Sequence, residues 1–63
     1  MSDTKHFLQW MTDRGGRVTL GEILKTTFAA EYRKHISLLR RMGHRITLKQ
    51  NFERPSENLY VLI

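Results

Sequence analysis

Apolar residues in the first segment of the chain recur at the spacing of a helix. Between residues 3 and 13 the large apolar positions are Phe7, Leu8, Trp10 and Met11. Residues three and four apart share one face of a helix, so this spacing predicts a helix over 3–13 with one face turned to a core. Ser2 or Asp3 is suited to cap its start, and the Gly15-Gly16 pair to end it.

A short β-favouring stretch and a second helix are expected next. Residues 17–19 read Arg-Val-Thr, which favours a strand. Thr19 and Glu22 stand three apart just before apolar Ile23 and Leu24. This is the spacing of a capping box, in which each side chain satisfies a free backbone N–H of the first helical turn. The pattern predicts a short second helix over about 20–25.

The longest helix is predicted over about 28–42. Two threonines precede it and favour a turn, with Thr27 suited to cap the helix. The residues expected to face the core are Phe28 or Ala29, Tyr32, Ile36, Leu39 and Met42. Gly43 is expected to end the helix in a left-handed conformation.

The period changes from helix to strand after Gly43. Ile46 and Leu48 alternate with polar residues, which is typical of a half-buried strand. Residues 51–58 form a polar loop that contains the only proline, and the apolar residues 59–63 predict a closing strand. Because an isolated hairpin is marginally stable, we expect this one to pack against the helices.

The distribution of charge along the chain indicates a class of binding partner. The formal net charge is +5, and the stretch 32–49 contains cations but no carboxylate. These cations are Arg33, Lys34, Arg40, Arg41, Arg45 and Lys49. A block of one sign creates a local field that attracts polyanions, while the simpler interpretation is a solvated basic face.

A motif in this basic stretch resembles a known family. Its residues are Lys34, Ile36, Leu39, Arg40, Gly43, His44 and Ile46. From about Val18 onward the chain resembles small winged helix-turn-helix domains. These include the N-terminal domain of biotin-operon repressor ligases and the small helix-turn-helix domains common in phage and prophage genes. The resemblance implies a single α+β domain over 1–63, with three helices, a two-stranded C-terminal wing and a short extra strand near 17–19.

The resemblance also implies double-stranded DNA as the partner. It places the recognition helix, about 28–42, in the major groove and the wing, 51–58, on the backbone or in the minor groove. The candidate DNA-binding residues are Thr27, Ala30, Arg33, Lys34, Ser37, Arg41, Arg45, Lys49, Asn51 and Arg54. One departure concerns the start of the recognition helix, where such domains often have Ser-Arg and this chain has Thr-Thr-Phe-Ala-Ala-Glu-Tyr.

Three residues near this surface have alternative interpretations. Arg40 caps the end of its helix or contacts phosphate. Arg54 reaches a minor groove or pairs with neighbouring Glu53 or Glu57. Phe52, at the loop tip, contacts a partner or folds back on the core.

Other kinds of chemistry find little support in the sequence. The chain has no cysteine, and the spacing of its three histidines does not suggest a metal site, so each is expected at the surface or its boundary. No nucleophile–base pair or glycine-rich phosphate loop is present, so we expect no enzyme activity and no cofactor. No apolar run reaches the roughly 18 residues of a membrane span, and we expect a cytoplasmic protein, in a bacterial host if it derives from a phage.

Two functions fit these observations. The first is a small DNA-binding protein, either a transcriptional regulator or an architectural, excisionase-like accessory factor. It would act as a homodimer or cooperative array through the first helix or residues 59–63. The alternative is a protein-interaction module of the same fold that presents its basic face to an acidic partner.

Overall fold

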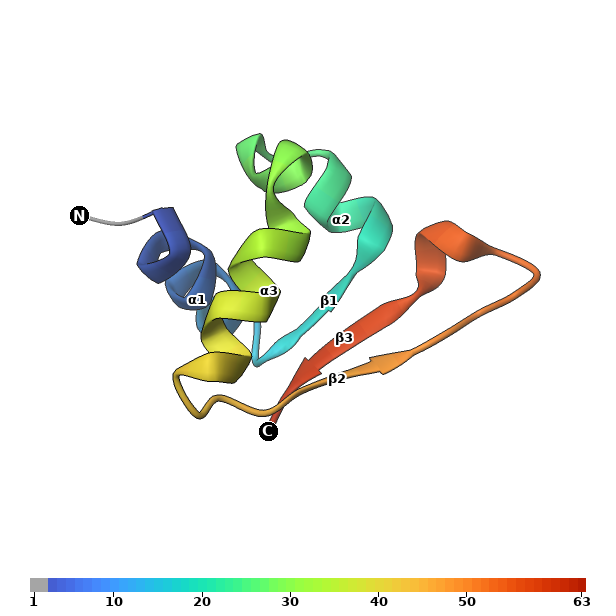
Figure 1. Ribbon diagram of the computed structural model, residues 1–63. Helices are drawn as coiled ribbons and strands as arrows, with labels where there is room; N and C mark the ends of the chain where they lie inside the picture. Colours follow the sequence, from blue (N-terminus) through green and yellow to red (C-terminus); the bar gives the residue numbers. More distant parts are fainter. Residues whose placement is uncertain (1–2) are drawn as a thin grey trace.

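The computed structural model describes residues 3–63, which form helices packed against a small antiparallel sheet (Figure 1). The elements are α1 (Asp3–Asp13), β1 (Arg17–Thr19), α2 (Leu20–Leu24), the 3-10 helix η1 (Thr27–Ala30), α3 (Tyr32–Arg41), β2 (Ile46–Lys49), the 3-10 helix η2 (Pro55–Glu57) and β3 (Leu59–Leu62). This α+β order agrees with the predicted one. Ser2, one of the two predicted caps of α1, lies outside the described residues.

The sheet has three strands, with β3 in the centre and β1 and β2 at its edges. Val18 of β1 and Leu48 of β2 both pair with Tyr60 of β3, and both pairings are antiparallel. The predicted hairpin is therefore present, and β1 extends it by one strand. In Figure 1 the loop of the hairpin projects past α2, on the side away from α1.

One core joins all three helices to the sheet. Its buried apolar residues are Phe7, Met11, Val18, Ile23, Ile36, Leu39, Ile46 and Tyr60. The ring of Phe7 lies 5.2 Å from that of Phe28 and 5.5 Å from that of His35, between ring centroids. Aromatic contacts at these distances add to the stabilisation from burial alone.

Two residues of α3 are placed differently from their prediction. His35, expected at the surface, is buried because its ring stacks on Phe7 and its Nδ1 shares a 3.0 Å hydrogen bond with Oγ1 of Thr4. Met42, expected in the core, is the residue that follows the last turn of α3 and is 60% exposed.

The predicted continuous helix over 28–42 is wrong, because the chain breaks at Glu31. Thr26, rather than Thr27, caps the first part: its hydroxyl accepts a 3.1 Å bond from the N–H of Phe28 and donates a 2.6 Å bond to the carbonyl of Ile23. The helix that follows, η1, is a 3-10 helix, and such helices rarely exceed four residues. Glu31 then leaves helical geometry with φ −129° and ψ 13°, and α3 begins at Tyr32.

Two of the predicted helix-boundary signals are confirmed, one at the start of α2 and one at the end of α3. Thr19 and Glu22 form the reciprocal capping box at the start of α2. Gly43 has φ +98°, and the N–H groups of Gly43 and His44 donate to the carbonyls of Arg40 and Leu39. This pair of bonds is the Schellman arrangement, which needs a left-handed residue and therefore favours glycine. It turns the chain from α3 toward β2.

The position of the cap before η1 can be tested with two adjacent threonines. We expect Thr26→Ala to lower the free energy of unfolding by about 1 kcal/mol, because a cap hydrogen bond is lost. Thr27→Ala should have almost no effect, since Thr27 is exposed and makes no cap bond. Urea unfolding followed by circular dichroism measures both variants. A larger loss from Thr27→Ala would contradict this capping arrangement.

Candidate nucleic-acid interface

The exposed face of α3 carries most of the predicted site residues. Spacings of three, four and seven residues place five polar side chains on one side of the helix. They are Arg33, Lys34, Ser37, Arg40 and Arg41, and all five are exposed. The opposite side of α3 is buried through His35, Ile36 and Leu39. The helix is therefore strongly divided between a core face and a cationic face.

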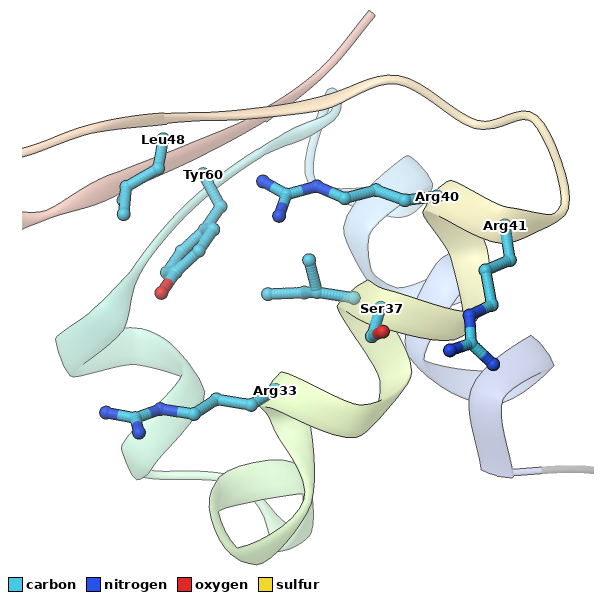
Figure 2. Close-up of a pocket in the computed structure, with 7 residues that line it drawn as sticks. Arg33, Ser37, Arg40, Arg41, Leu48 and Tyr60 are labelled. Atoms are coloured by element: carbon cyan, nitrogen blue, oxygen red, sulfur yellow. The ribbon is translucent and has the colours of Figure 1, made fainter.

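A hollow of about 450 Å³ separates this part of α3 from the sheet. It is lined by Arg33, Ile36, Ser37, Arg40, Arg41, Leu48 and Tyr60. Figure 2 shows Leu48 and Tyr60 on the strands, opposite the side chains of α3, with the Tyr60 hydroxyl directed into the hollow. Leu48 is 37% exposed because it lines the hollow instead of entering the core. The hollow thus combines cationic walls with an apolar floor.

Arg40 connects α3 to the edge strand β2. Its Nε and Nη2 donate hydrogen bonds of 3.1 and 2.8 Å to the carbonyl oxygen of Ile46. The predicted structural alternative for Arg40 was a cap on its own helix. The observed contact is instead a brace between α3 and β2, and it sets one wall of the hollow.

Arg33 is held against an aromatic ring at the other end of the hollow. Its Nε donates a 3.2 Å hydrogen bond to the hydroxyl of Tyr32, which raises the pKa of the guanidinium. The ring of Tyr32 in turn lies 6.2 Å from that of Tyr60 in an edge-to-face arrangement. Arg33 is therefore an exposed cation whose position is guided by Tyr32.

The tyrosine hydroxyl in the hollow favours its neutral form. Burial is the largest effect and raises the pKa of Tyr60, and the nearby Tyr32 raises it further. Arg33 and Arg40 act in the opposite direction. At neutral pH the hollow therefore presents a neutral hydroxyl beside guanidinium groups, and this combination can donate hydrogen bonds to an anionic oxygen.

Thr27 and Ala30 lie apart from the cationic hollow. Both are exposed and line a second hollow of about 480 Å³, between η1 and the start of α1. Asp3 and Glu31 also line it. Carboxylates repel phosphate, so this hollow does not share the polyanion-binding character of the first.

Arg45 and Lys49 are exposed but do not line the cationic hollow. Side chains alternate along a strand, so Lys49 points to the opposite side of β2 from Ile46 and Leu48. By the same alternation Arg17 of β1 lies on that outer face, because its neighbour Val18 is buried. The outer face of the sheet is thus a second basic area.

Asn51 and Arg54 lie in the hairpin loop, where both have structural contacts. The side-chain oxygen of Asn51 accepts hydrogen bonds from the N–H groups of Glu53 and Arg54, at 3.1 and 3.0 Å. Arg54 forms an exposed ion pair with Glu57 at 3.7 Å. Phe52, which follows Asn51 in this loop, is 86% exposed, so it does not fold back on the core.

Tyr60 and Leu48 are part of the hollow but were not among the predicted site residues. Strand alternation places both on the sheet face turned toward the helices, and that pattern also suits ordinary core residues. The distinguishing feature is the gap between α3 and β2, which depends on tertiary packing.

No protein-family model, curated protein or solved structure matches the chain. Within residues 3–63, no group of three or more histidine or acidic side chains is placed to hold a metal ion. No helix in the same range is long and apolar enough to cross a membrane.

Adjacent arginines provide a test of the brace between α3 and β2. We expect Arg40→Ala to lower the free energy of unfolding by about 1.5 kcal/mol, because two charge-assisted hydrogen bonds to Ile46 are lost. Arg41→Ala removes the same charge without such a bond and should change it by less than about 0.5 kcal/mol. Equal losses in urea unfolding would contradict a specific role for Arg40.

The raised pKa of Tyr60 predicts a loss of stability in alkaline solution. The unfolded chain releases the tyrosine proton near pH 10, whereas the folded chain holds it to higher pH. Folding stability from this group is therefore complete below about pH 10 and falls as the pH rises toward the folded pKa. In urea titrations from pH 8 upward, Tyr60→Phe should flatten this fall. An unchanged pH dependence would contradict the assignment.

Proposed function

We propose that this protein is a small winged helix-turn-helix domain that binds double-stranded DNA. In this proposal α2, η1 and α3 form the helix-turn-helix, and the β2–β3 hairpin is the wing. The motif in residues 34–46 and the α+β layout with its C-terminal hairpin support this proposal. Its role would be that of a transcriptional regulator or an architectural, excisionase-like accessory factor.

The observation that carries the proposal is the cationic face of α3 beside the hollow. Four cations lie on this face, and the sequence of α3 contains no carboxylate. At 1.5 Å per residue, a ten-residue helix is about 15 Å long, and the major groove, about 12 Å wide, admits an α-helix. The hollow then accepts the sugar-phosphate backbone between α3 and the wing, with Arg33 and Arg41 as its phosphate contacts.

Sequence reading by α3 would be limited to few positions. Ser37 lies at the centre of the exposed face and Lys34 at its edge, outside the hollow, and both are the candidates for base contacts. Arg33 and Arg41 lie nearer the ends, where phosphate is the expected partner. A site with few base contacts gives modest specificity, so regulation would need several copies on one DNA.

A salt series with a charge-matched pair of variants tests this function. Fluorescence anisotropy of a labelled mixed-sequence duplex should show binding that weakens with salt, with a log–log slope of about −3 if three phosphates are neutralised. Arg41→Ala should weaken binding to all sequences and reduce the slope by about one. Arg17→Ala removes an equal charge from the outer face of the sheet and should leave the slope nearly unchanged.

The possible outcomes separate the candidate surfaces. An equal effect from Arg17→Ala would place the DNA on the outer face of the sheet. No binding at low salt would reject DNA as the partner. The alternative, a protein-interaction module, would then be favoured by the exposed Phe52 and by the position of β2 at the edge of the sheet.

A further inference from the structure

The hollow between α3 and the sheet leaves apolar surface in contact with water. Leu48 stands opposite Tyr60 in the strand register, on the sheet face turned toward the helices, yet it is 37% exposed. Ile36 of α3 lines the same space. The volume of about 450 Å³ falls within the range of roughly 300–1,000 Å³ that is typical of small-molecule sites. A ligand of that size would therefore cover apolar surface that the fold itself leaves open.

Contacts between α3 and the sheet hold the hollow at a fixed width. The guanidinium of Arg40 is attached to the carbonyl oxygen of Ile46 on β2 through two hydrogen bonds. β2 is in turn paired with β3 along its whole length, from Ile46 to Lys49. The walls are consequently in place before a ligand arrives, and a preformed site loses less entropy on binding than a flexible one.

The positive charge in the hollow has no acidic partner in the described part of the protein. Arg33, Arg40 and Arg41 line the hollow without a carboxylate, and none of the three forms an ion pair there. A guanidinium carries five N–H donors. Arg40 uses two of them on the carbonyl of Ile46, and Arg33 uses one on the hydroxyl of Tyr32. The remaining donors can bind an anionic ligand.

Tyr60 adds an aromatic ring and a hydroxyl to the same space. Figure 2 shows the side chains of Leu48 and Tyr60 next to each other on the strands, with the hydroxyl directed into the hollow. Guanidinium groups bind carboxylates in a bidentate geometry, and a neutral hydroxyl can donate a further bond to the same group. The ring of Tyr60 and the side chain of Leu48 can contact the apolar part of that molecule. The hollow thus combines donors for one small anion with apolar contacts for its body.

The apolar part of the hollow discriminates among anions. A phosphate group can bind the arginines, but it has no apolar part with which to cover Leu48 or the ring of Tyr60. A carboxylate attached to a ring or a short hydrocarbon does both, and burial of its apolar part adds to the electrostatic attraction. The chemistry of the hollow therefore fits a small carboxylate with an apolar body better than it fits a phosphate.

We propose that this hollow is a binding site for a small carboxylate with an apolar body, and that the bound carboxylate excludes DNA. The first part stands on the hollow alone. The second part rests on the proposed DNA-binding function, in which the sugar-phosphate backbone occupies the same hollow. A small molecule of this class would then release the domain from DNA.

The binding test uses 3-phenylpropionate as the probe, with amide NMR spectra of the natural protein as the readout. The probe should bind with a Kd of about 1 mM, the order expected for a ligand of its size, and should shift signals of residues that line the hollow. Acetate has the charge without the ring, and 3-phenylpropanol has the ring without the charge. At matched ionic strength, each should bind at least several-fold more weakly.

Two pairs of variants make the binding result specific. Leu48→Ala and Arg33→Ala should each weaken binding of 3-phenylpropionate several-fold, because one removes an apolar contact and the other a guanidinium. Leu24→Ala and Arg17→Ala remove the same side chains outside the hollow, from exposed positions, and should leave binding nearly unchanged. Leu48→Ala should not alter the weak response to acetate. Circular dichroism confirms that each variant is folded.

The second part of the proposal is tested on a labelled duplex by fluorescence anisotropy. If 3-phenylpropionate and DNA compete for the hollow, the probe at nine times its Kd should weaken apparent DNA binding about tenfold. Acetate at the same concentration should produce only the effect of added salt. Leu48→Ala should need several-fold more 3-phenylpropionate for the same effect.

The outcomes separate the ligand site from the DNA-binding function. If 3-phenylpropionate binds no better than acetate or 3-phenylpropanol, the ligand site is rejected, and DNA binding is judged by its own salt series. If the probe binds but weakens DNA binding no more than acetate does, the exclusion of DNA is rejected. If the probe binds and the protein binds no duplex at low salt, the ligand site is supported and the proposed function fails.

Discussion

The packing around Phe7 determines where a functional face can lie. Phe7 is completely buried, and its ring contacts those of Phe28 and His35. These contacts join α1 to η1 and to one side of α3, and the Thr4–His35 hydrogen bond fixes the same helices to each other. Because α3 uses this side for the core, its other side faces solvent, and that side carries the cations. In a chain of 63 residues, few other contacts could replace this cluster.

Local signals made most of the fold predictable. The Thr19–Glu22 capping box, the left-handed Gly43 and the alternation after Arg45 each depend on a few neighbouring residues, so the sequence alone reveals them. The break at Glu31 was not predictable from periodicity. Apolar residues before and after it fit one continuous helix equally well, so the pattern gives no signal for the change from 3-10 to α-helical geometry. The burial of His35 likewise required a partner 31 residues away in sequence.

The candidate site was predictable only where it lies on a single helix. Helical spacing alone places Arg33, Lys34 and Ser37 on one exposed face. The hollow depends on three separate elements, α3, β2 and β3, and on the contact that holds them at a fixed separation. That contact is the pair of hydrogen bonds from the Arg40 guanidinium to the carbonyl oxygen of Ile46. A sequence shows the charge of Arg40 but not which backbone carbonyl accepts its hydrogen bonds.

In the proposed function, the cations on α3 would act on DNA before the two molecules touch. The electric field of the charges on α3 extends over roughly 10 Å at 0.1 M salt, so these charges would orient the domain before it touches the DNA. Within α3, Arg40 is held by the carbonyl of Ile46, whereas Arg33, Lys34 and Arg41 are exposed cations that make no bond to the sheet and would serve that first approach. In the proposed complex, electrostatic docking of α3 therefore comes first.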